Sequence, residues 1–93
     1  MITISVTYTD PLQIEDLKNL PFNFKFIDIL SKKGKKEGWK LKNYYGAHLD
    51  PFAVVTTEDK LLKVFYSEAD NVIESLIKYL KNYGTSSKSS KSN

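Results

Sequence analysis

The sequence of 93 residues is 41% hydrophobic and 27% charged, which is the composition of one small folded domain. It contains no cysteine and a single histidine, His48, which excludes disulfide frameworks, thiolate metal sites, thiol redox chemistry and histidine-rich metal centres. No apolar run approaches the ~18–20 residues of a membrane span, and the first residues lack the basic segment of a secretory signal, so we expect neither insertion nor signal-directed secretion.

The positive charges come from lysine alone. The net charge is +3, with 14 basic residues against 11 acidic ones. Lys88 and Lys91 lie near the C-terminus, so residues 1–84 carry 12 lysines and the same 11 acids, a net charge of +1. Nucleic-acid-binding domains more often present a basic face that includes arginine. The near-neutral charge of residues 1–84 is not typical of that class.

The first two predicted elements are a strand and a helix. Residues 2–8 alternate apolar and polar side chains, the pattern of a strand with one buried face. Asp10 and Gln13 are placed as a capping box around Pro11, which suits the first helical position, and Pro21 ends the segment. The expected buried stripe of this helix comprises Leu12, Ile14, Leu17 and Leu20.

A second strand and a second helix follow. Residues 22–30 are nearly continuously apolar, which predicts a strand covered on both faces. Lys32-Lys33-Gly34-Lys35-Lys36 is expected to be a loop that is either simply solvated or binds phosphates or an acidic partner. Residues 37–45 predict a short helix, with Gly46 as its C-terminal cap.

The last third of the chain predicts a hairpin and a helix. Residues 51–55 and 61–66 are strand-like, and the short polar segment between them favours an antiparallel connection. Ser67, with Asp70 three residues later, predicts the start of a helix that ends at Gly84. Residues 85–93 are a Ser/Lys-rich tail of low complexity, so the folded domain is expected to be residues 1–84.

The predicted order is therefore β-α-β-α-β-β-α. A βαβ opening requires a right-handed crossover with parallel strands, and the hairpin adds an antiparallel pair, giving an α/β fold with a four-stranded mixed sheet flanked by helices. This arrangement resembles the thioredoxin and glutaredoxin family, most specifically over residues 45–55 and the hairpin. The resemblance implies a cis Asp50–Pro51 peptide bond directly before the third strand.

The family's reactive cysteines would fall in residues 8–13, where this sequence has none, so a member of this kind is redox-inactive. Asp10 and Asp50 would lie near the vacated position beside Pro51, in a cis-proline groove. Paired carboxylates can share a proton or hold a divalent cation, but capping a helix and preceding a turn are commoner roles for aspartate. His48 has no matching nucleophile, and we expect no metal, no cofactor and no enzymatic activity.

A non-enzymatic structural or interaction module is therefore the favoured function. Small, cysteine-free, lysine-only chains of this type resemble proteins of tailed bacteriophages, which implies an auxiliary (decoration or bridging) capsid protein in the virion or the host cytoplasm, with subunits such as the major capsid protein as partners. Two alternatives stay open: a weak nucleic-acid-binding accessory protein, and a thiol-independent ligand binder that uses the cis-proline groove. The candidate partner-binding residues are Lys32, Lys33, Lys35, Lys36, Tyr66, Tyr79, Tyr83, Lys88 and Lys91.

Overall fold

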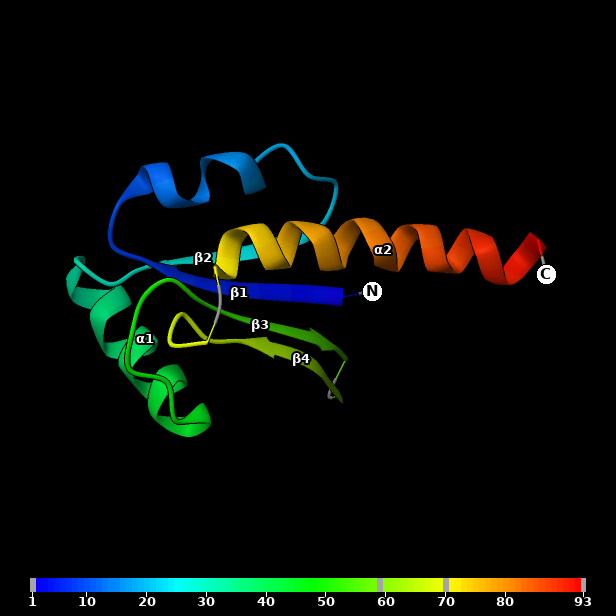
Figure 1. The fold of residues 1–93 in the computed structure, drawn as a ribbon. Coiled ribbons are helices and arrows are strands. Elements are labelled where there is room, and N and C mark those ends of the chain that lie inside the picture. The colour runs from blue at the N-terminus through cyan, green and yellow to red at the C-terminus, as the bar shows by residue number, and fades with distance from the viewer. Residues whose placement is uncertain (1, 59, 70, 93) are drawn as a thin grey trace.

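The fold was examined in a computed structural model, which describes residues 2–58, 60–69 and 71–92, the segment 84–92 as backbone only. Four strands and three helices follow one another along the chain (Figure 1). In chain order they are β1 (Ile2–Tyr8), the 3-10 helix η1 (Pro11–Leu17), β2 (Asn23–Asp28), α1 (Lys32–Tyr45), β3 (Phe52–Thr57), β4 (Lys60–Phe65) and α2 (Val72–Ser92).

The strands form one mixed sheet in the order β2-β1-β3-β4. β1 runs parallel to β2, with Val6 opposite Phe26, and antiparallel to β3, with Val6 opposite Ala53. β3 and β4 form the expected antiparallel hairpin, with a register irregularity between Val55 and Thr56. The predicted α/β class, the parallel βαβ opening and the four-stranded mixed sheet are confirmed.

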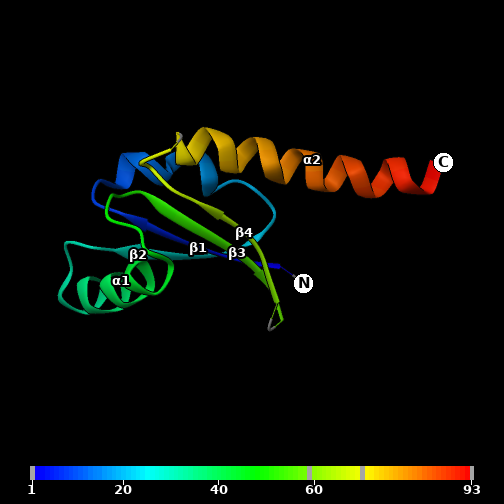
Figure 2. The same ribbon diagram turned by 60° about the horizontal axis from the view of Figure 1, so that its bottom comes forward.

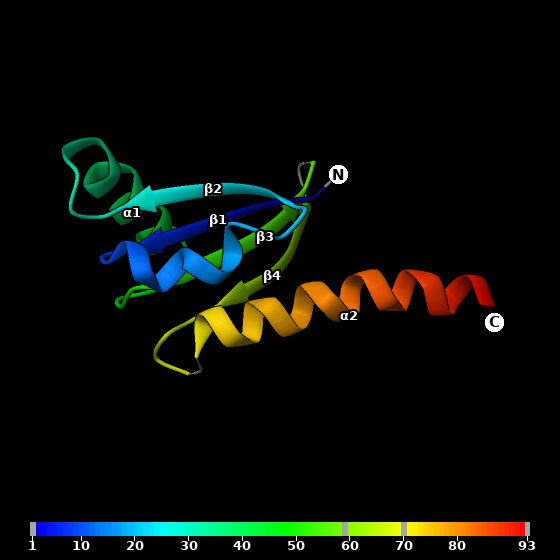
Figure 3. The same cartoon turned by 90° about the horizontal axis from the view of Figure 1, so that it is seen from above.

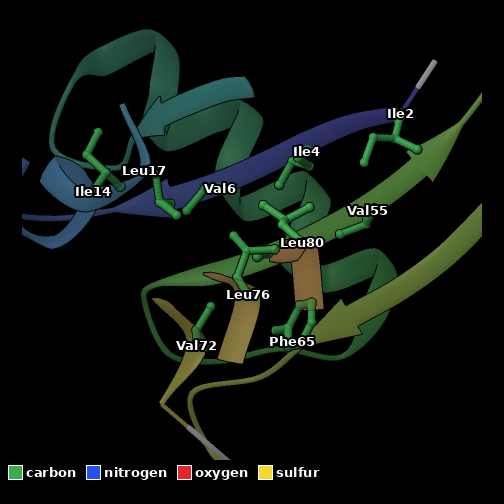
Figure 4. Packing of buried hydrophobic residues seen from close by; sticks show 11 residues of the cluster. Ile2, Ile4, Val6, Ile14, Leu17, Val55, Phe65, Val72, Leu76 and Leu80 are labelled. Atoms are coloured by element: carbon green, nitrogen blue, oxygen red, sulfur yellow. The ribbon is translucent and has the colours of Figure 1, made fainter. Parts of the chain in front are cut away.

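Side chains that alternate along the strands build a separate core on each face of the sheet. Ile4 and Val6 of β1 point toward η1 and α2, where Leu17 and Leu76 are fully buried (Figure 4). On the opposite face Phe52 of β3 packs with the apolar side of α1. Helices therefore cover both faces, with η1 and α2 on one side and α1 on the other (Figure 2).

The structure corrects the predicted lysine-rich loop, because α1 already begins at Lys32. Ser31 caps the helix by accepting a hydrogen bond from the Gly34 backbone N–H, and lysine is itself a good helix former. At the other end Gly46 adopts the left-handed conformation with φ of 73°, so the predicted C-terminal cap is confirmed.

Two expectations about the first half of the sequence are wrong in detail. β2 is an edge strand of six residues whose Asn23 and Lys25 are exposed, so it is not covered along its whole length. Asp10 and Gln13 form the predicted capping box, but the helix they open is a short 3-10 helix. Its tighter turn leaves Leu12 outside the buried stripe, 76% exposed.

The last helix begins later and ends later than predicted. Asn71 accepts a hydrogen bond from the Glu74 backbone N–H and so caps α2 at Val72, whereas the Ser67 hydroxyl donates to the Pro51 carbonyl. Asp70, the expected capping partner of Ser67, lies outside the described residues. The backbone stays helical through Gly84 to Ser92 and extends past the sheet (Figure 1), because one interior glycine costs a helix only ~1 kcal/mol.

Candidate functional site

The candidate site lies at the end of the sheet where β1 and β2 finish and β3 begins (Figure 3). In the sheet register Thr7, near the end of β1, stands opposite Phe52, the first residue of β3. The Asp50–Pro51 peptide bond directly before β3 is cis, as expected. Asp50 and Pro51 therefore lie against the end of β1, although Thr7 and Asp50 are 43 residues apart in the sequence.

Asp50 is part of a hydrogen-bonded network that faces the interior. The Thr7 hydroxyl donates to Asp50 Oδ1 at 2.6 Å and accepts from the Phe52 backbone N–H at 3.0 Å. Lys42 Nζ lies 2.9 Å from Asp50 Oδ2, and the two side chains are only 2% and 12% exposed. The Lys42 ammonium also stands 4.9 Å from the centre of the Trp39 ring. Both carboxylate oxygens of Asp50 therefore have partners within the chain, which favours a structural role for it.

The segment after β4 holds the same loop from its other side. The Tyr66 hydroxyl donates to the Tyr45 carbonyl at 2.7 Å, and the Ser67 hydroxyl donates to the Pro51 carbonyl. Glu68 accepts a hydrogen bond from the His48 backbone N–H at 2.8 Å. The loop between α1 and β3 is consequently fixed by three contacts from the β4–α2 connection as well as by the Asp50 network.

Hydrogen bonds to its carboxylate hold the pKa of Glu68 below its ordinary value. The largest cause is the hydrogen bond from its own backbone N–H, followed by the one from His48. Electrostatic attraction from His48 also lowers the pKa of Glu68. Glu68 is exposed, so its ionised form is stabilised by these contacts while it stays in water.

Replacing Glu68 by glutamine is expected to remove part of the acid sensitivity of the fold. A carboxylate with a lowered folded pKa stabilises the native state above its ordinary pKa of 4.5, and this contribution is lost as the pH falls through the lower folded value. Melting temperatures of wild type and Glu68→Gln from pH 7 to pH 3 (about the range over which carboxylates titrate) should therefore converge in acid. Profiles that stay parallel would contradict the assigned contacts.

Asp10 has partners of its own, and they belong to the start of η1. Its Oδ1 accepts from the Leu12 backbone N–H at 3.0 Å, and its backbone N–H donates to Gln13 Oε1 at 3.1 Å. The structure therefore gives Asp10 and Asp50 separate partners. Within residues 2–58, 60–69 and 71–92, no three histidine, cysteine, aspartate or glutamate side chains gather as metal ligands would. In those same ranges no helix is long and apolar enough to cross a membrane.

Three exposed leucines lie at this end of the sheet. Leu12 follows β1, Leu30 follows β2 and Leu49 precedes β3, with exposed fractions of 76%, 75% and 51%. We refer to Leu12, Leu30 and Leu49 as the leucine end. The sequence pattern missed it, since Leu12 was assigned to a buried stripe and Leu30 to a strand. The signal that could have found it was position, because all three leucines lie in connections at the same end of the sheet, and connecting segments run over the surface.

The remaining predicted site residues lie elsewhere and do not form one surface. Tyr66 is bonded to the Tyr45 carbonyl, and Tyr79 packs edge-on against Phe65 with the ring centres 5.7 Å apart. Tyr83 stacks on Tyr79 and is 44% exposed. Lys32, Lys33, Lys35 and Lys36, which were expected in a loop, lie on α1. The side chains of Lys88 and Lys91 are outside the part of the chain that the structure describes. Tyr66 and Tyr79 are thus mainly structural contacts.

Comparison with known proteins identifies no relative of this chain, because no family model, no curated protein and no solved structure matches it. Arguments about function therefore start from the geometry described above. That geometry has two features on which such arguments can rest: the buried Thr7–Lys42–Asp50 network, and the exposed leucine end, in which Leu49 is next to Asp50.

Proposed function

We propose that this chain is a non-enzymatic interaction module that docks a partner protein through the leucine end. The observation that carries the proposal is the exposure of three leucines in three connections between elements at one end of the sheet. Clustered exposed apolar side chains are typical of protein-binding surfaces. The carboxylates beside these leucines have partners in the chain: Asp50 pairs with Lys42, and Asp10 and Asp28 accept hydrogen bonds from the backbone N–H groups of Leu12 and Leu30.

The scaffold of the proposed module is thioredoxin-like. Support comes from the strand order β2-β1-β3-β4, the parallel βαβ opening, the helices on both faces and the cis bond before β3. In that family the same end of the sheet carries the reactive cysteines, and here the corresponding segment, residues 8–13, contains a helix cap and Leu12. We propose that this end of the sheet binds a partner protein, where the family carries out thiol redox chemistry.

The proposed partner is a protein subunit of a large assembly, with an auxiliary role in a phage capsid as the specific form suggested by the cysteine-free, lysine-only composition. The leucine end suits a permanent contact of this kind, because apolar burial is not screened by salt whereas exposed ion pairs are. Native particles should therefore retain this chain during size fractionation in about 1 M salt, where the Debye length is only ~3 Å.

The test is a triple substitution of Leu12, Leu30 and Leu49 by serine, introduced in the native source. Burial of three leucines contributes several kcal/mol, at about 1.5–3 kcal/mol each, so the triple variant should be released from the particle. Leu61→Ser is the matched control, because Leu61 is similarly exposed (47%) at the start of β4, the opposite end of the sheet. A wild-type chain that elutes free, or a triple variant that stays bound, would contradict the proposal.

A further inference from the structure

The lysines of this protein are unevenly distributed over its surface. On the side of the sheet that η1 and α2 cover, lysines and acidic residues are mixed. One hollow there is lined by both Lys78 and Glu74. The exposed Lys18 directly follows η1, which carries the exposed Glu15 and Asp16. That side of the sheet therefore does not present charges of one sign to a partner.

The outer side of α1 is different, because its charges are almost all positive (Figure 2). The helix has six lysines and one glutamate, Glu37, which is already paired with Lys25 of β2 at 2.9 Å. Lys42 is buried against Asp50. The other five lysines are exposed and have no ion-pair partner among the residues that the structure describes. We call these five the basic face: Lys32, Lys33, Lys35, Lys36 and Lys40.

The basic face is electrostatically unfavourable for the chain on its own. Four of its lysines lie at the start of the helix, where the backbone dipole is positive, and no acidic residue stands in the first turn. Asp28, before the helix, lines a hollow with Lys33, but its carboxylate accepts a hydrogen bond from the Leu30 backbone N–H. Like charges one turn apart also repel each other. A bound anion would relieve both effects, so the basic face favours an anionic ligand.

Three of these lysines form a row along α1 that ends at an exposed aromatic ring. Lys32, Lys36 and Lys40 follow one another at intervals of four residues, so they lie on one side of the helix, about 6 Å apart along its axis. Tyr44 continues the same spacing and is 80% exposed. Its ring is held at 82° to the ring of Tyr45, with the ring centres 4.8 Å apart. The helix therefore presents a line of positive charges that leads to an accessible ring.

The surface beside this ring is hollowed. A depression of about 300 Å³ lies between α1 and the strands β1 and β2, and its apolar lining includes Ile27, Leu41 and Tyr44. Lys25 and Lys40 line the same hollow, and the one acidic residue in it is the partner of Lys25. An apolar hollow that combines an aromatic ring with ammonium groups suits a flat heterocycle attached to a phosphate.

We propose that α1 and this hollow bind single-stranded nucleic acid, with phosphates along the basic face and an unpaired base on the Tyr44 ring. Lysine binds phosphate as a point charge, and exposed aromatic rings stack bases of any sequence. An acidic protein would neutralise the lysines but would make no use of the ring and the hollow. A duplex keeps its bases paired and stacked. The proposal is independent of the leucine end, because none of its three leucines lines the hollow.

The experiment is a titration of a labelled, mixed-sequence DNA single strand of about 15 nucleotides with the purified full chain, followed by fluorescence anisotropy. Binding is measured between about 50 mM and about 200 mM salt. Wild type should bind with a Kd of about 1–100 μM near physiological salt, and the affinity should fall steeply as the salt concentration rises. The slope of log K against log salt concentration then reports the number of phosphate contacts.

Lys36→Gln with Lys40→Gln tests the basic face. This variant should bind about 10-fold or more weakly in the lowest salt, and its salt slope should be shallower by about 1.4, because each phosphate contact on a single strand contributes ~0.7. Glutamine is as good a helix former as lysine, so the melting temperature should stay that of wild type. Lys78→Gln with Lys81→Gln on α2 is the matched control, since it removes the same charge from the other side of the sheet. It should bind nearly as wild type does.

Tyr44→Ser separates stacking from charge. It should weaken binding about 5-fold or more and leave the salt slope unchanged, because a ring is removed and no charge is. Tyr83→Ser, which removes another exposed tyrosine but from α2, is the matched control and should bind as wild type does. The fluorescence of Trp39, the only tryptophan, should change when the strand binds, since it lies on the same helix.

Four results would overturn the inference. One is a wild type that does not bind the strand in about 50 mM salt at a chain concentration of about 100 μM. Another is a Lys36→Gln, Lys40→Gln variant that binds as tightly as its control. A third is competition by poly-glutamate that equals competition by unlabelled single strand, which would make an acidic protein the ligand. The last is a duplex that binds as tightly as the single strand while Tyr44→Ser has no effect, which would exclude a stacked base.

Discussion

Replacing Asp50 by alanine is expected to lower the free energy of unfolding by about 3–5 kcal/mol. The substitution leaves the Lys42 ammonium 2% exposed and without its counterion, and it removes the acceptor of the Thr7 hydroxyl. An unpaired buried charge is among the costliest defects that a single substitution creates. Urea denaturation followed by the fluorescence of Trp39, which stands beside Lys42, measures the loss directly.

The double variant Lys42→Met, Asp50→Ala is the control for this prediction. It removes both charges at once, and exchange of a buried ion pair for apolar groups is often close to neutral. The double variant should therefore recover most of the stability that Asp50→Ala loses, giving a large coupling energy between the two positions. Additive losses, or a loss below about 1 kcal/mol for Asp50→Ala, would show that the pair is not buried in solution.

Replacing Gly34 by alanine should destabilise the protein by about 3 kcal/mol, although alanine outranks glycine by ~1 kcal/mol in a helix interior. A Cβ at this position would lie 1.9 Å from the Asp28 carbonyl oxygen and 2.6 Å from Ser31 Oγ. The first of these atoms belongs to the backbone, so α1 must move away from the end of β2 as a unit. The same urea titration gives the loss.

Gly38 and Gly46 provide graded controls on the same helix. An alanine Cβ at position 38 would meet the end of the Ile29 side chain, at 2.1 Å from Cδ1, which can rotate away, so a loss of about 1 kcal/mol is expected. Position 46 is open, and only its φ of 73° opposes alanine, at about 1–2 kcal/mol. A stabilising Gly34→Ala, as helix propensity alone predicts, would contradict the close approach of α1 to β2.

The start of α1 shows where sequence reasoning reached its limit. Residues 32–36 contain no apolar residue, so periodicity has no signal there, and two glycines in the segment 34–38 argue against a helix. Both glycines are needed because the helix lies against Asp28 and Ile29. The pattern of β1, the hairpin and the Asp10 capping box were predicted correctly, because each depends on neighbours within a few residues.

The candidate site divides in the same way. Its position at the cis Asp50–Pro51 bond followed from a resemblance carried by contiguous residues. The partners of Asp50 did not, since Thr7 is 43 residues away and nothing in the sequence marked Lys42 as buried. The leucine end depends on three connections from different parts of the chain lying at one end of the sheet.

By itself, the sequence determined the α/β class, the order of the elements, the strand hairpin and the absence of thiol chemistry, since all of these depend on residue type and local pattern. Only the tertiary structure decided that Lys42 is buried against Asp50 and that η1 and α2 cover one face of the sheet while α1 covers the other. Which side chains are buried, and which helix covers which face of the sheet, depends on how the crossover places α1 relative to η1 and α2. No local pattern in the sequence encodes that geometry.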